Sequence, residues 1–61
     1  MTNTTRAALV FWLTAEAPSQ EDMTVLFEAV RADDIAAIRA LVVANNGPTN
    51  DERWAEAMAN V

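Results

Sequence analysis

The chain has 61 residues, of which 52% are hydrophobic, and its nine acidic side chains outweigh four arginines to give a net charge of −5. A chain of this length forms one domain at most, so we treat residues 1–61 as a single domain. Because it contains no lysine and only four arginines, the composition argues against binding to nucleic-acid phosphates or to an anionic membrane surface.

The hydrophobic fraction is high for so short a chain. A domain of this size buries only about 60% of its unfolded surface when it folds alone. This one has no cysteine for a disulfide and no histidine–cysteine cluster for a structural metal. We therefore expect a second copy to cover part of the apolar surface in a homodimer. The acidic balance also favours a basic protein partner.

The first predicted helix covers residues 4–16. Threonines and an asparagine precede it and offer N-cap oxygens, and Pro18 is expected to end it, because the residue before a proline avoids the α region. The run from Leu9 to Leu13 is apolar throughout and so points all around a helix. We expect one side to pack within the chain and another on a second copy. The alternative is an interior helix of an ordinary small core.

Two further helices are predicted on either side of a break at Asp33 and Asp34. An uninterrupted helix would place these aspartates in the apolar stripe that runs from Met23 to Val30, where a buried, unpaired carboxylate pair is expensive. We therefore expect a turn here, with one of the aspartates capping the next helix. The resulting fold class is all-α, with three or four short helices built on a central helix-turn-helix hairpin, in a dimer.

Capping residues set the bounds of the later helices. Ser19 begins the second, and Thr49 with Glu52 forms a capping box that begins the fourth. Gly47 is expected to supply a left-handed stop after the third. With these limits the helices are predicted over residues 20–31, 34–45 and 50–60.

The sequence predicts two contact surfaces. Trp12 is a candidate interface anchor, although an intramolecular core would suit it equally well. Arg31 and its charged neighbours offer both signs at the hairpin turn, but Arg31 can instead pair locally with Glu28 or Asp34. The predicted homodimer interface consists of Leu9, Val10, Trp12, Leu13, Trp54 and Met58. The predicted partner-binding residues are Glu28, Arg31, Asp33, Asp34 and Arg39.

The residue types give little support to catalysis. Histidine, the commonest general acid–base, is absent, as are cysteine, lysine and tyrosine. The carboxylate pairs Glu21-Asp22 and Asp33-Asp34 lie at predicted helix starts, where they favourably meet the helix dipole. A hard-cation site would need several oxygens converging from a formed loop. We therefore predict no enzyme, no cofactor and no metal site; a divalent-metal-dependent enzyme is the alternative.

Residues 24–50, TVLFEAVRADDIAAIRALVVANNGPTN, resemble a single ankyrin repeat. The chain departs from that pattern at Val25-Leu26-Phe27, where the repeat opening has Pro-Leu-His, and at Asp33, where glycine is usual. A solitary repeat cannot bury its own faces, so convergence of a helical hairpin on similar packing residues is the alternative. The residues that carry the resemblance are Thr24, Leu26, Ala29, Arg31, Ala32, Asp34, Ala37, Arg39, Ala40, Leu41 and Pro48.

A second resemblance covers more of the chain. The opening MTNTT, the apolar first helix, the TAEAP junction, LFEAV, DIAAIR, the NNGP turn and ERWAEA together resemble the small anti-activator proteins of Mu-like Pseudomonas phages. The resemblance implies a phage-encoded inhibitor that binds a LuxR-type quorum-sensing regulator of the host and blocks its attachment to DNA. It also implies a pilus-assembly ATPase as another target. The alternative function is a non-inhibitory helical docking or assembly module.

On this reading the protein works in the cytoplasm of the infected bacterium. The opening residues lack the basic stretch and apolar core of a secretory signal, and the longest apolar run, Ala7 to Leu13, is too short to cross a bilayer. Its acidic surface would lie against the basic DNA-binding face of the regulator. Imitation of DNA phosphates by the acidic residues is a further alternative.

Overall fold

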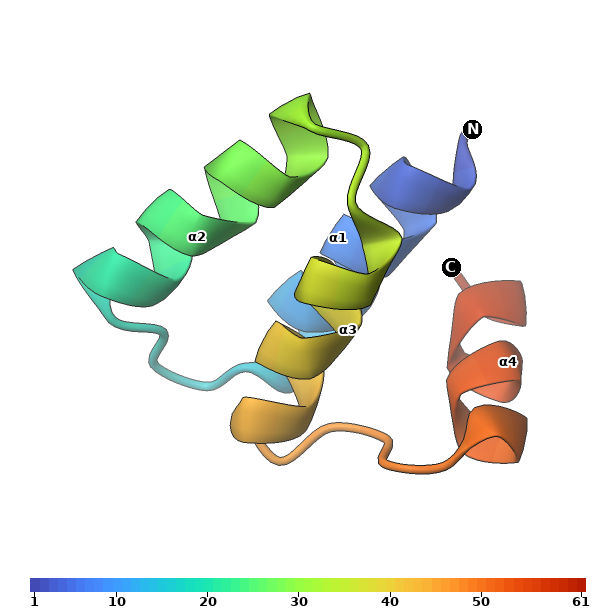
Figure 1. The fold of residues 1–61 in the computed structure, drawn as a ribbon. Coiled ribbons are helices and arrows are strands. Elements are labelled where there is room, and N and C mark those ends of the chain that lie inside the picture. Colours follow the sequence, from blue (N-terminus) through green and yellow to red (C-terminus); the bar gives the residue numbers. More distant parts are fainter.

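The computed structural model describes residues 1–61 and is all-helical, with four helices and no strand. The helices are α1 (Asn3–Thr14), α2 (Gln20–Arg31), α3 (Ile35–Ala44) and α4 (Asp51–Ala59). α1 and α3 lie together at the centre of the molecule, with α2 on one side and α4 on the other (Figure 1). Because α1 contacts each of the other three, it is the helix around which the fold is arranged.

The bounds of α2 agree with the prediction, and α3 and α4 are each one residue shorter at both ends than predicted. α1 differs more, because it ends at Thr14 and not beside Pro18. The Thr14 hydroxyl donates a hydrogen bond to the carbonyl oxygen of Val10 at 2.8 Å, and Ala15 leaves the helix with extended backbone angles. The chain therefore turns toward α2 before the proline is reached.

A side-chain oxygen caps the N-terminus of each later helix. Ser19 Oγ accepts from the backbone N–H of Asp22 at 3.0 Å, as predicted for α2. The capping box predicted for α4 is wrong by one residue: Asn50 Oδ1, and not the Thr49 hydroxyl, accepts from the N–H of Arg53 at 2.8 Å. Asparagine is preferred over threonine as an N-cap, so Asn50 takes the role that the adjacent Thr49 could also have filled.

The predicted break between α2 and α3 is confirmed. Asp33 adopts a left-handed conformation with φ 57°, and its N–H bonds to the carbonyl of Val30 at 3.2 Å. The next N–H, that of Asp34, bonds back to the carbonyl of Ala29 at 2.8 Å, which completes a Schellman motif. Asp34 then caps α3, with Oδ1 accepting from the N–H of Ala37 at 3.1 Å.

α3 ends in the same motif, but the left-handed residue is Asn46, with φ 66°, and not Gly47 as predicted. The N–H of Gly47 bonds to the carbonyl of Val42 at 2.8 Å. A Cβ at position 47 would lie 2.3 Å from Val42 Cγ1 and 2.9 Å from the Val42 carbonyl oxygen. The glycine is therefore needed for space beside Val42 and not for its freedom in φ.

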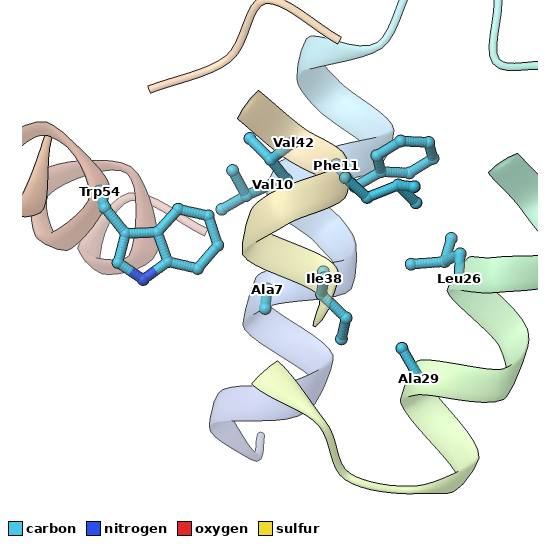
Figure 2. Close-up of a cluster of buried hydrophobic side chains, with 9 residues drawn as sticks. Ala7, Val10, Phe11, Leu26, Ala29, Ile38, Val42 and Trp54 are labelled. Atoms are coloured by element: carbon cyan, nitrogen blue, oxygen red, sulfur yellow. The ribbon is translucent and has the colours of Figure 1, made fainter. Parts of the chain in front are cut away.

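The core lies chiefly between α1 and α3. Its largest fully buried side chains are Phe11 and Val10 of α1 with Ile38 and Val42 of α3. α2 closes one side, and the single aromatic of α4, Trp54, closes the other (Figure 2). The buried core residues are Ala7, Val10, Phe11, Leu26, Ala29, Ile38, Leu41, Val42 and Trp54.

Candidate interaction surfaces

α1 is apolar on both its inner and its outer face. Val10 and Phe11 face the core and are at most 2% exposed. On the other side Trp12 is 56% and Leu13 is 75% exposed, and Leu9 is half-buried. Residues three and four apart share one side of a helix, so Leu9, Trp12 and Leu13 form one apolar patch. We call this patch the α1 outer face.

Three of the predicted dimer-interface residues are turned into their own chain. Val10 is 2% and Trp54 is 9% exposed, so their side chains offer almost no surface to a second copy. Met58 is partly buried against the same core. The prediction of Val10 and Trp54 as interface residues is therefore wrong, because both are buried where α4 packs on α1 of its own chain, and Met58 keeps only part of its side chain exposed. Leu9, Trp12 and Leu13 are the residues that keep an outward position.

α2 also leaves apolar side chains uncovered, which the sequence did not indicate. Leu26 is buried, but Phe27 beside it is 62% exposed and Val30 is 39% exposed. The predicted stripe from Met23 to Val30 is thus wider than the surface that α1 and α3 cover. Only Leu26 and Ala29 reach the core fully, since α2 packs along one edge of the α1–α3 pair. Spacing alone gives no signal for where such a stripe stops being buried.

The predicted partner-binding charges divide into two groups. Asp33 accepts a hydrogen bond from the buried Thr4 hydroxyl, and Asp34 caps α3, so both have structural roles in the turn. Glu28 and Arg31 are exposed on α2 and their side chains make no hydrogen bond or ion pair. The alternative in which Arg31 pairs with Glu28 or Asp34 is not what the structure shows. These two side chains are the ones free to meet a partner.

Arg39, which was predicted to bind a partner, instead faces α4 of its own chain. Its Nη2 lies 2.6 Å from Asp51 Oδ1, in the only ion pair of the structure, and its side chain is 31% exposed. Its guanidinium carbon also lies 5.5 Å from the centroid of the Trp54 ring, within cation–π range. Asp51 lies 12 residues after Arg39, beyond the end of α3 and the linker to α4, so no local sequence rule pairs them. Arg39 is a structural contact between α3 and α4.

The structure offers little to small ligands. No group of three or more acidic side chains lies close enough together to hold a metal ion. The surface depressions surround the linker between α3 and α4 and are lined mainly by polar side chains such as Asn46, Asn50 and Arg53. Small-molecule sites are usually lined by apolar and aromatic groups. None of the four helices is long and apolar enough to cross a lipid bilayer.

Comparison with protein-family models, with characterised proteins and with solved structures finds no match to this chain. The likeness to an ankyrin repeat and to phage anti-activators therefore stays a prediction from the sequence. The structure adds the positions of the side chains. α1 and α2 each have an exposed apolar face, and Glu28 and Arg31 are exposed charges on α2.

Proposed function

We propose that this protein acts by binding other proteins, without catalysis, and that the α1 outer face joins two copies in a homodimer. The observation that carries the proposal is the exposure of Trp12 and Leu13, at 56% and 75%, side by side on one helix. Burying a large apolar side chain contributes about 1.5–3 kcal/mol. In a twofold dimer each such residue is buried twice, because the same patch occurs on both subunits.

The test is sedimentation equilibrium of the unmodified protein and of Leu13→Asp. We expect a dimer at micromolar concentration for the first and a monomer for the second, because the substitution places a charge in a desolvated contact. Folding should be little changed, since substitutions at exposed positions usually shift stability by about 0.5 kcal/mol or less. Val43→Asp on α3, where the valine is 40% exposed, is the matched control and should leave the dimer intact. A 6.7 kDa monomer throughout, or a dimer that survives Leu13→Asp, contradicts the proposal.

We further propose that the exposed charges of α2, Glu28 and Arg31, bind a host protein, and that this protein is a LuxR-type transcription regulator. The resemblance to phage anti-activators supports this choice. Glu28 and Arg31 support it too, because both are exposed and lack an internal partner. The net charge of −5 favours association with a basic DNA-binding face. Occupation of that face would keep the regulator from DNA.

Arg31→Glu tests this contact. Its melting temperature should stay close to that of the unmodified protein, whereas inhibition of regulator–DNA binding should weaken because the arginine loses its partner carboxylate. Arg53→Glu, the same charge reversal at an exposed site on α4, is the control and should inhibit normally. Full inhibition by Arg31→Glu removes that residue from the contact. If the unmodified protein disturbs no LuxR-type regulator, the docking-module alternative, or inhibition of a pilus-assembly ATPase, replaces this proposal.

A further inference from the structure

α4 is attached to the rest of the molecule by very few buried atoms. Trp54 is its only buried residue. Ala57, Met58 and the following Val61 are partly buried against the core, and the remaining residues of α4 are exposed. α4 contacts α1 and lies on the opposite side of the molecule from α2, with which it makes no contact (Figure 1). The helix therefore rests on the α1–α3 pair from outside and does not fill its interior.

Two arginines supply the polar part of the attachment, one at each end of α4. Arg39 of α3 pairs with Asp51 in the first turn and lies over the Trp54 ring. Arg6 of α1 donates from Nη1 to the carbonyl oxygens of Met58, at 3.1 Å, and Val61, at 3.3 Å. Met58 lies in the last turn of α4 and Val61 follows the helix, where a cation also meets the negative end of the dipole.

The surface of α1 and α3 that the Trp54 ring contacts is apolar. The indole points toward Val10 of α1 and Val42 of α3, which are 2% and 0% exposed (Figure 2). We call Val10, Val42 and the two flanking arginines, Arg6 and Arg39, the α4 seat. The α4 seat thus combines a small apolar surface with two positive charges. The Trp54 ring of α4 packs on the apolar surface, and the Asp51 carboxylate and the carbonyls at the C-terminal end of α4 bind the two arginines.

We propose that α4 is a detachable strap, and that the α4 seat is a further binding site whose chemistry suits an acidic amphipathic helix with one aromatic side chain. The two arginines of the α4 seat favour an acidic helix, and its apolar surface, formed by Val10 and Val42, favours an aromatic side chain. Phe11 and Ile38, each 0% exposed, lie on α1 and α3 between Trp54 on one side and Leu26 of α2 on the other (Figure 2). Because α4 is tethered to the chain, it competes for the seat with a helix from another molecule at an effective concentration of about millimolar. The outside helix must therefore bind the seat tightly enough to displace α4.

The first test is amide hydrogen exchange of the full chain. α4 amides should exchange through a local opening, at rates well above those of α1 and α3. Arg39→Gln should raise the α4 rates by roughly fivefold, as expected for an ion pair to an exposed carboxylate together with a cation–π contact, and should leave the rates of α3 close to unchanged. Arg31→Gln removes the same charge from an exposed site on α2 and should leave α4 unaffected. If the most protected amides of α4 and α3 exchange at one common rate, the strap proposal is overturned.

The second test asks whether the seat accepts a helix in trans. The probe is a fluorescent synthetic peptide with the sequence of residues 49–61, added to the full chain carrying Trp54→Ala, whose own α4 has lost its anchor. We expect this chain to keep the circular dichroism of α1–α3 and to bind the peptide saturably. A peptide with its tryptophan replaced by alanine should not bind, and Arg39→Gln in the chain should weaken binding. Loss of folding in the Trp54→Ala chain, or absence of saturable, tryptophan-dependent binding, overturns the proposal.

Discussion

α3 and α4 both pack on α1, but they do so in different ways. α3 brings Ile38 and Val42, each 0% exposed, into the centre of the core. α4 contributes a single aromatic ring at the edge of the core, that of Trp54, which is 9% exposed. Arg39 and Arg6 bind the two ends of α4. Buried apolar area gives most of the free energy of folding, while partly exposed ion pairs contribute little. The α1–α3 contact therefore holds the fold together, and the α4 contact adds a part that can be removed.

The largest difference between the two regions should appear when each loses its main aromatic side chain. Phe11→Ala empties the α1–α3 core and should cost about 3–5 kcal/mol. That is most of the stability of a domain held by about 0.05–0.15 kcal/mol per residue, so the helical circular dichroism should be largely lost at room temperature. Trp54→Ala should leave a helical protein with a cooperative thermal transition. Equal loss of structure in both variants would mean that α4 belongs to the same cooperative unit as α3.

A smaller effect separates the two helix caps. Asp34→Ala and Asn50→Ala remove equivalent side-chain acceptors at the starts of α3 and α4, each worth about 1 kcal/mol. We expect Asp34→Ala to lower the melting temperature of the whole protein. Asn50→Ala should leave that temperature nearly unchanged and should instead speed hydrogen exchange within α4. A drop in melting temperature of the same size in both would remove the distinction between the two helices.

The smallest effect concerns the left-handed residues that precede and follow α3. Asn46→Gly should change the free energy of unfolding by about 0.5 kcal/mol or less, because Asn already tolerates this conformation and its exposed side chain makes no hydrogen bond. Asp33→Gly should cost about 1 kcal/mol, because the buried Thr4 hydroxyl loses its acceptor. Urea unfolding of the two variants measures the difference. A larger free energy of unfolding for Asp33→Gly would show that the Thr4–Asp33 hydrogen bond contributes less than the left-handed backbone of Asp33 costs.

Features governed by neighbouring residues were predictable from the sequence. α2 begins after Ser19 and ends before the aspartate pair, as expected, because caps and turns involve residues only a few positions apart. The choice of Asp34 as the cap of α3 follows the same logic. The errors at helix ends were small and had local causes: Asn50 competed with Thr49 as a cap, and Asn46 with Gly47 as the left-handed residue.

Features governed by distant residues were not predictable. The apolar run from Leu9 to Leu13 fits inward and outward positions equally well, so the sequence could not separate buried Val10 from exposed Trp12. Arg39 was placed on an outer surface because its partner Asp51 lies on another helix. The exposure of Phe27 depends on how far α1 and α3 extend beneath α2. In each case the deciding quantity is the position of a second helix.

The close approach of Gly47 to Val42 also predicts how the chain tolerates sequence change. In a library of single variants scored for folding, position 46 should accept asparagine, aspartate and glycine, the residues that visit the left-handed region most readily. Position 47 should accept glycine alone, because even the methyl group of alanine would overlap the Val42 side chain and its carbonyl oxygen. Two adjacent positions of one turn would thus differ in the substitutions they accept, because the first is limited by backbone torsion and the second by volume.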